Sequence, residues 1–271
     1  MKRFILMLCA ALLCQLPTQS QNKLQNPTTM NSNTLKKEKM KVEIWSDVMC
    51  PFCYIGKRKF ENALSRFEHA DSVEVTWKSF QLNPAMKTDA TKSTVQYLAE
   101  VKGWSLEQAQ QSTAYVTNMA GEVGLEYHLD KAIVANSFDA HRFIQLAKKH
   151  NKGDAAEERL FKAYFTEGKN TADHATLIQL ATDIGLDAGE MKAVLQSDTY
   201  SEEVRHDLAE AQQLGVSGVP FFVINRKYAV SGAQQPETFL GALSRAWSEQ
   251  PLQNISSSDN NASCDIDGNC K

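Results

Sequence analysis

The chain has 271 residues, of which 42% are hydrophobic and 23% are charged, as is typical of a soluble globular protein. This composition excludes a mostly disordered chain, a collagen-like fibre and a small scaffold held together by disulfides. The formal net charge of -3 creates no overall field that would attract nucleic acid, so we expect no nucleic-acid partner. The six cysteines fall into three pairs, which are Cys9 with Cys14, Cys50 with Cys53, and Cys264 with Cys270.

The N-terminus has the pattern of a secretory signal. Two basic residues precede the apolar run 4–14, and small polar residues follow it. The run is too short to span a bilayer, which needs about 20 residues. We expect residues 1–20 to be a signal peptide removed on export to the periplasm, with no stable membrane insertion afterwards. The polar segment 21–40 is predicted to be a flexible leader, and translation from Met40 would give a cytoplasmic form instead.

A strand-helix-strand unit is predicted after the leader. Polar and apolar residues alternate in 41–45 and again in 73–78, which indicates two strands. Segment 56–67 between them has one apolar face and is predicted to be a helix. A crossover of this kind joins parallel strands with a right-handed connection.

Segment 93–214 has helical periodicity, and we expect six or seven helices in it. Three capping boxes mark helix starts, at Ser105 with Gln108, Asp187 with Glu190, and Thr199 with Glu202. Strands 221–224 and 228–231 then form a predicted hairpin, helix 235–249 follows, and residues 250–271 form a flexible tail. This order is that of an α/β, thioredoxin-like fold with a large all-α helical insertion, the domain parts being 41–92 and 215–249.

The segment Cys50-Pro51-Phe52-Cys53 lies between the first strand and the helix. C-x-x-C in such a context is typical of a redox motif. On the first helical turn, residues i and i+3 are close enough for their sulfurs to bond, and the helix N-terminus stabilises the thiolate of the first cysteine. Pro51 suits this turn because its missing N–H would be unpaired there. Cys50 is therefore predicted to be the attacking sulfur and Cys53 the resolving one.

A permanent disulfide or half of a zinc site would be an alternative role for this pair. Structural zinc needs four ligands, typically from two close pairs. Cys264 and Cys270 are widely spaced in the predicted tail. We therefore expect no metal, and since no glycine-rich phosphate loop is present, we predict no cofactor.

Val219 and Pro220 are the candidate substrate-binding residues. They stand directly before the predicted strand 221–224, where the first residue of a strand tolerates proline. A cis bond between them would expose the Val219 backbone beside Cys50 to an extended substrate. Most X-Pro bonds are trans, so the residues alone favour this arrangement only weakly.

Three segments, Ile44–Gly56, Asn136–Phe143 and Gly215–Phe222, resemble the DsbA family of thiol-disulfide oxidoreductases, and within it the FrnE-like branch. The resemblance covers about residues 41–249. It implies a thioredoxin fold with a helical insertion and dithiol-disulfide exchange with protein or peptide substrates. It also implies a cis proline at Pro220.

The same branch is similar to 2-hydroxychromene-2-carboxylate isomerase and kappa-class glutathione transferase. These enzymes bind glutathione and typically carry serine where this chain has Cys50. A glutathione-dependent isomerase or transferase is thus the second functional hypothesis, with glutathione as a further candidate partner, and a non-catalytic, chaperone-like module is the third. The presence of both Cys50 and Cys53 favours dithiol exchange.

Many thioredoxin-like enzymes carry a buried acid six residues before the first cysteine, where this chain has Ile44. Proton transfer to and from Cys53 is therefore expected to use water or another group. Trp45, Trp77 and His141 are expected to be structural residues rather than parts of the catalytic set.

Cys264 and Cys270 flank turn-forming Asp, Gly and Asn residues that would bring them together. A flexible linker of the 16 residues from Ser248 to Cys264 has a root-mean-square span of about 20–24 Å, enough to reach Cys50. FrnE-like proteins often end in a similar pair. The tail pair is predicted either to exchange with Cys50 and Cys53 or to form an inert terminal disulfide.

Overall fold

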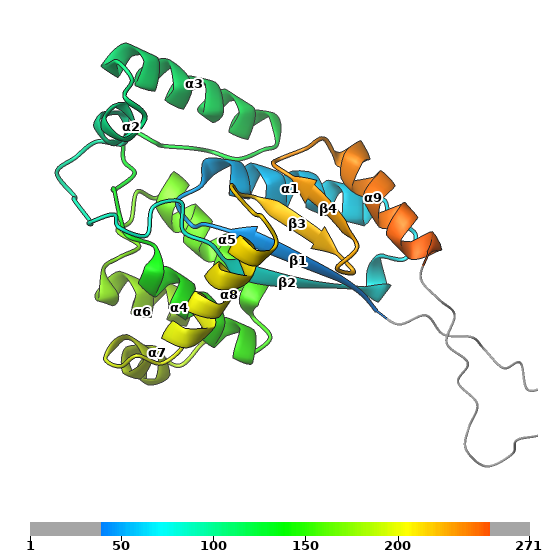
Figure 1. Ribbon diagram of the computed structural model, residues 1–271. Helices are drawn as coiled ribbons and strands as arrows, with labels where there is room; N and C mark the ends of the chain where they lie inside the picture. The colour runs from blue at the N-terminus through cyan, green and yellow to red at the C-terminus, as the bar shows by residue number, and fades with distance from the viewer. Residues whose placement is uncertain (1–38, 250–271) are drawn as a thin grey trace, which may run out of the picture. The chain divides into compact units, whose positions relative to one another are not determined.

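The computed structural model describes residues 39–249. The predicted signal peptide, the leader up to residue 38 and the tail with Cys264 and Cys270 lie outside the described residues. The described part contains a four-stranded sheet of order β2-β1-β3-β4 with helices packed against it (Figure 1). The fold is thus α/β and thioredoxin-like with a helical insertion, as predicted.

The strands of the sheet are β1 (Met40–Ser46), β2 (Val73–Ser79), β3 (Phe221–Ile224) and β4 (Tyr228–Ser231). β1 and β2 are parallel, which confirms the predicted crossover. β3 is antiparallel to both β1 and β4, which confirms the hairpin. β1 begins at Met40, the last residue of the predicted leader, and the side chain of Met40 is fully buried.

Helix α1 (Pro51–Ser65) connects β1 to the short 3-10 helix η1 (Ala70–Ser72), which precedes β2. α1 begins five residues before the predicted segment 56–67. Pro51 occupies the first turn and Cys50 is the N-cap residue, which places the C-x-x-C motif on the first turn.

The two faces of the sheet are covered by different helices. Ile44 faces α1 and α9 (Pro236–Ser248), where it joins Phe60, Phe222 and Phe239 in the main core. The next residue, Trp45, points to the opposite face because side chains alternate along a strand. There it packs with Ala211 in a smaller cluster under α8.

Seven α-helices connect β2 to β3, in agreement with the six or seven predicted. They are α2 (Thr94–Lys102), α3 (Leu106–Glu122), α4 (Phe138–Lys149), α5 (Gly153–Phe161), α6 (His174–Asp183), α7 (Ala188–Leu195) and α8 (Ser201–Gln213), with the π-helical turn η2 (Lys162–Thr166) after α5. α2 and α3 pack together and lie on the α1 side, whereas α4 to α8 form a second group (Figure 1). Within residues 39–249, no helix is long and apolar enough to cross a membrane.

The predicted helix starts at Ser105 and Asp187 are confirmed, since each side chain accepts a backbone N–H three residues later. The predicted start at Thr199 is wrong. The residue before α8 is Tyr200, which has a φ of 67° and no capping side chain. The Thr199 hydroxyl instead hydrogen-bonds the hydroxyl of Ser197 at 2.8 Å.

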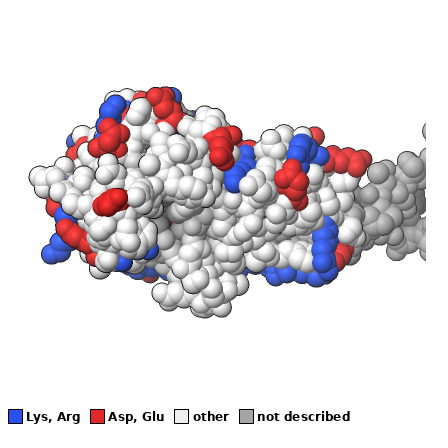
Figure 2. Space-filling view, turned by 90° about the horizontal axis from the view of Figure 1, so that it is seen from above, with Lys and Arg blue, Asp and Glu red and all other residues white. Residues whose placement is uncertain are grey.

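Charged side chains are dispersed on the face of the molecule that lies at the top in Figure 1. Lys, Arg, Asp and Glu form small mixed groups there, separated by broad uncharged areas (Figure 2). This face therefore carries no extended basic patch of the kind that binds nucleic acid.

Candidate active site

Cys50 and Cys53 lie at the N-terminal end of α1, with Cys50 as its N-cap residue. The Cys50 N–H donates to the Asp47 carbonyl at 2.9 Å, and the Cys53 N–H donates to the Cys50 carbonyl at 3.0 Å. Both thiols are free and buried. Cys50 therefore sits where the free N–H groups and the dipole of the helix favour a negative charge.

The Val219-Pro220 peptide bond is cis. The Cys50 thiol lies against this bond, with its Sγ 3.4 Å from the Val219 carbonyl oxygen. Pro220 itself accepts a hydrogen bond from the Gly232 N–H at 2.8 Å, which anchors the start of β3 to the end of β4. The structure thus brings together Cys50 and Val219, which are 169 residues apart in sequence.

Cys53 is the more deeply placed of the two cysteines and is 1% exposed. Burial raises its pKa well above the usual value, and the neighbouring Cys50 sulfur raises it further. Hydrogen bonds from the Asp47 backbone and the Ser46 side chain lower the pKa by less. Cys53 therefore holds its proton until a nearby group accepts it.

Aromatic rings support the first turn of α1. The Tyr127 hydroxyl donates to the Pro51 carbonyl oxygen at 2.8 Å. The Tyr127 ring stacks on Phe165 with 4.6 Å between ring centroids, and Tyr54 stacks on Phe161 at 4.9 Å. These contacts join the C-x-x-C turn to the insertion and hold its backbone in place.

The loop before Cys50 is fixed by the buried side chain of Asp47. Its carboxylate accepts from the Leu82 N–H at 2.8 Å and from the Met49 N–H at 3.3 Å. His141 lies behind it, with Nε2 3.6 Å from Asp47 Oδ1. Burial alone would lower the pKa of His141, but the Asp47 carboxylate outweighs this and raises it. His141 is thus buried behind the loop that precedes Cys50, and its structural role stays a prediction.

Two apolar side chains near the motif are exposed to solvent. Phe52, inside the motif, is 37% exposed, and Leu82, whose backbone binds Asp47, is 52% exposed. Both have apolar surface available for a peptide that approaches Cys50.

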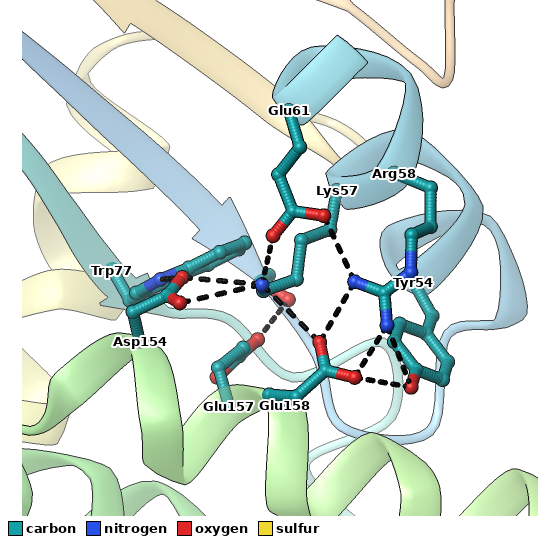
Figure 3. Close-up of polar contacts among 9 residues, drawn as sticks. Tyr54, Lys57, Arg58, Glu61, Trp77, Asp154, Glu157 and Glu158 are labelled. Atoms are coloured by element: carbon teal, nitrogen blue, oxygen red, sulfur yellow. Dashed lines mark hydrogen bonds and ion pairs between the residues drawn. The ribbon is translucent and has the colours of Figure 1, made fainter. Parts of the chain in front are cut away.

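Two glutamates on α5 face the site from the insertion, and the sequence patterns did not indicate them. Glu158 turns toward Arg58 and Tyr54, whereas its neighbour Glu157 turns to a different partner (Figure 3). That partner is the hydroxyl of Ser46 at the end of β1. The run Glu-Glu-Arg at 157–159 has the composition of a solvated helix face, and only the fold shows that Glu157 is buried.

One further group of side chains within residues 39–249 could offer ligands to a cation, namely His206, Asp207 and Glu210. Existing contacts account for both acids. The Asp207 carboxylate binds Lys78 at 2.8 Å and the Ser79 N–H at 3.0 Å, and Glu210 pairs with Lys78 at 3.0 Å. These contacts give no support to a metal site, and the group includes neither cysteine.

The strand order, the helix-capping cysteine and the adjacent cis proline define a thioredoxin-fold protein with a dithiol site. Residues 41–244 match the family of the DSBA-like thioredoxin domain, and the chain belongs to this family. Protein YwbO of Bacillus subtilis, an uncharacterised protein, is 31% identical over 205 residues, or 75% of this chain and 95% of its own length.

Solved structures agree with this assignment. A "probable DsbA oxidoreductase" from Streptomyces coelicolor is 39% identical, with a TM-score of 0.74 over 86% of this chain and 98% of its own. The cytosolic disulfide reductase DsbM of Pseudomonas aeruginosa shares the fold at 16% identity, with a TM-score of 0.55 over 77% of this chain and 98% of its own. DsbM has also been solved with glutathione.

Proposed function

We propose that this protein is a thiol-disulfide oxidoreductase whose reactive pair is Cys50 and Cys53. The observation that carries the proposal is the position of the Cys50 thiol. It caps a helix N-terminus and lies 3.4 Å from the carbonyl oxygen of Val219, which precedes the cis Pro220. A peptide that pairs with the Val219 backbone would have its own sulfur next to Cys50. Membership of the DSBA-like family supports the same chemistry.

In the reducing direction, the Cys50 thiolate attacks one sulfur of a substrate disulfide. A bond forms between Cys50 Sγ and that sulfur, and the other substrate sulfur leaves as a thiolate. Cys53 then loses its proton and attacks Cys50 Sγ, which releases the second substrate thiolate. The protein is left with a Cys50–Cys53 disulfide, and the substrate has gained two electrons. The reverse sequence oxidises a substrate dithiol.

The substrates would be thiol- or disulfide-containing proteins and peptides. Pro51 and Phe52 shape the first helical turn, and exposed Phe52 and Leu82 offer apolar contacts beside it. Glutathione is a further candidate partner, since a structural neighbour has been solved with it. No group at the site calls for a metal or a nucleotide.

Reduction of insulin disulfides and oxidation of a reduced peptide test the proposal. The wild type should catalyse at least one of these reactions, and Cys50→Ser should abolish it because the attacking sulfur is gone. Cys53→Ser should form mixed disulfides but fail to turn over. Equal activity in wild type and Cys50→Ser would contradict the proposal.

The isomerase or transferase hypothesis makes a different prediction. A glutathione transferase needs no resolving thiol, so glutathione conjugation would survive Cys53→Ser. The presence of cysteine at position 50, where those enzymes typically carry serine, favours dithiol exchange.

Cys264 and Cys270 are proposed to form a second dithiol that exchanges with the motif. The support comes from their spacing and from a linker of the length needed to reach Cys50. In a Cys53→Ala variant under limiting oxidant, mass spectrometry should find Cys50 bonded to Cys264 or Cys270. If no such species forms, the pair is an inert terminal disulfide.

Export to the periplasm is likewise a proposal, supported by the signal-like residues 1–20. Cell fractionation and N-terminal sequencing test it. A periplasmic protein cut after Ser20 would support export, and an uncut cytoplasmic protein would contradict it.

A further inference from the structure

The Ser46 side chain connects the resolving cysteine to a buried acid. Ser46 ends β1, two residues after Ile44, so both side chains face α1. Its hydroxyl donates to Glu157 Oε1, and the same side chain lowers the pKa of Cys53. Ser46 therefore acts on both residues, and Cys53, Ser46 and Glu157 form a series that runs from α1 through β1 into the insertion.

Every member of this series is buried. Ser46, Cys53 and Glu157 are each 1% exposed. A carboxyl group with so little solvent contact costs folding free energy when it is ionised, unless partners compensate. Its neighbour Glu158 has such partners in Arg58 and Lys57. Among residues 39–249, Ser46 is the only residue whose side chain hydrogen-bonds Glu157.

We propose that Glu157 exchanges the proton of Cys53 through the Ser46 hydroxyl during disulfide exchange. The inference deepens the proposed function, on which it rests, by naming the group that serves the resolving thiol. Ile44, two residues before Ser46 on the same face of β1, has no titratable group, and Glu157 supplies a carboxyl to this region from a helix of the insertion.

In the resolving step, Cys53 gives its proton to the Ser46 oxygen, and Ser46 gives its own proton to the Glu157 carboxylate. The Cys53 thiolate then bonds to Cys50 Sγ, and the Cys50–substrate bond breaks to release the substrate thiolate. In the reverse direction, the departing Cys53 thiolate takes its proton back along the same path.

The environment of Glu157 suits this exchange near neutral pH. Burial raises the pKa of Glu157 to about 7, against a smaller opposing effect of the Ser46 hydrogen bond. The charged or titratable groups that act on it lie on three helices, and they are Lys57 on α1, His141 and Lys148 on α4, and Asp154 on α5. A group with such a pKa can both accept and donate a proton at ordinary pH.

Lys57 does not compete with Ser46 for Glu157. Its buried ammonium group pairs with Glu61, with Asp154 at 3.3 Å and with Glu158 at 3.2 Å (Figure 3). The positive charge of Lys57 is thus already paired with three other carboxylates. Glu157 therefore remains available to the Ser46 hydroxyl.

A single-turnover experiment separates the two chemical steps. The full chain is used with Cys9, Cys14, Cys264 and Cys270 replaced by serine, so that only the motif reacts. The reduced protein is mixed with excess disulfide peptide between pH 5 and 9, quenched in acid, and analysed by mass for the Cys50–peptide species and for the oxidised protein. The rate at which the mixed species forms measures the attack by Cys50. The rate at which it decays measures the attack by Cys53.

Glu157→Gln and Ser46→Ala should each slow the decay about 100-fold, at the lower end of general acid-base effects. The pH midpoint of the decay should move from near 7 in the wild type to higher pH in both variants, because Cys53 then loses its proton without help. Formation of the mixed species should be unchanged, which shows that the variants are folded and that Cys50 is reactive.

Glu202→Gln is the matched control, with the same change at an exposed position of α8 that pairs only with Arg205. Its decay rate and pH midpoint should match the wild type. Unchanged decay in Glu157→Gln and Ser46→Ala, or an equal effect in Glu202→Gln, would overturn the relay. Absence of the mixed species in the wild type would instead overturn the proposed function itself.

Discussion

Gly56 on α1 packs directly against Pro220, and a Cβ at position 56 would lie 2.9 Å from Pro220 Cγ. Real Cβ atoms do not approach another carbon so closely, so only glycine fits without a shift of the neighbouring chain. This contact sets the distance between the helix that carries Cys50 and the peptide bond that follows Val219. Gly56 is thus a spacer for the candidate site.

Gly56→Ala should lower the free energy of unfolding by about 1–3 kcal/mol, as overpacked cores do. It should also reduce disulfide exchange, because the Val219 carbonyl would move away from Cys50. The matched control is Gly241→Ala in α9, where a Cβ meets nothing within 4 Å. That change should be neutral or stabilising by about 0.4–1 kcal/mol. Equal effects of the two changes in chemical denaturation would contradict the spacer role.

The stability of the protein should fall as pH rises through neutrality because of Glu157. Its pKa is raised from 4.5 to about 7 in the folded chain, so the folded state holds the proton more tightly. The resulting stabilisation is complete below pH 4.5 and is lost as pH rises past 7, by up to about 3 kcal/mol. Denaturation of Glu157→Gln should lack this dependence. A pH profile identical to that of the wild type would contradict the prediction.

Glu158 should contribute stability of the opposite pH dependence. Burial alone would raise its pKa, but Arg58, Tyr54 and Lys57 lower it to about 2. This contribution is present above pH 4.5 and is lost as pH falls toward 2. Glu158→Gln should therefore lower the free energy of unfolding by about 1–3 kcal/mol at pH 7. The variant should also lose less stability than the wild type as the pH falls. The exposed pair of Glu202 with Arg205 is the control, and Glu202→Gln should leave stability unchanged.

Tyr127→Phe should destabilise the first turn of α1 while the ring stack remains. The variant loses the hydroxyl that donates to Pro51 at 2.8 Å, at a cost of about 0.5–1.5 kcal/mol. Tyr115→Phe is the control, since Tyr115 is 63% exposed on α3. Equal melting temperatures for the two variants in thermal denaturation would show that the Tyr127 hydrogen bond contributes nothing to stability.

The elements that were predictable from sequence are those whose pattern is local. An apolar run followed by a short turn and a partner segment placed β3 and β4 at their observed bounds, and Ser105 with Gln108 marked the start of α3. The start of α1 was placed too late in segment 56–67, because its first turn lacks an amphipathic pattern. At α8 the capping pattern indicated Thr199, but the N-cap residue is Tyr200, which has a left-handed backbone conformation.

The candidate site was predictable only where residues form a motif. The spacing of Cys50 and Cys53 indicated the reactive pair, but the contact of Gly56 with Pro220 depends on how a helix and a distant loop meet. Glu157 could not be identified because its burial arises from packing of the insertion against β1.

In the proposed function, Cys50 attacks the substrate disulfide and Cys53 resolves the mixed disulfide. Cys53→Ser should be mixed with a disulfide peptide and mapped by mass spectrometry, beside the double variant Cys50→Ser/Cys53→Ser. We expect a stable peptide adduct on Cys50 that is absent from the double variant. No adduct on Cys50 in Cys53→Ser would contradict it.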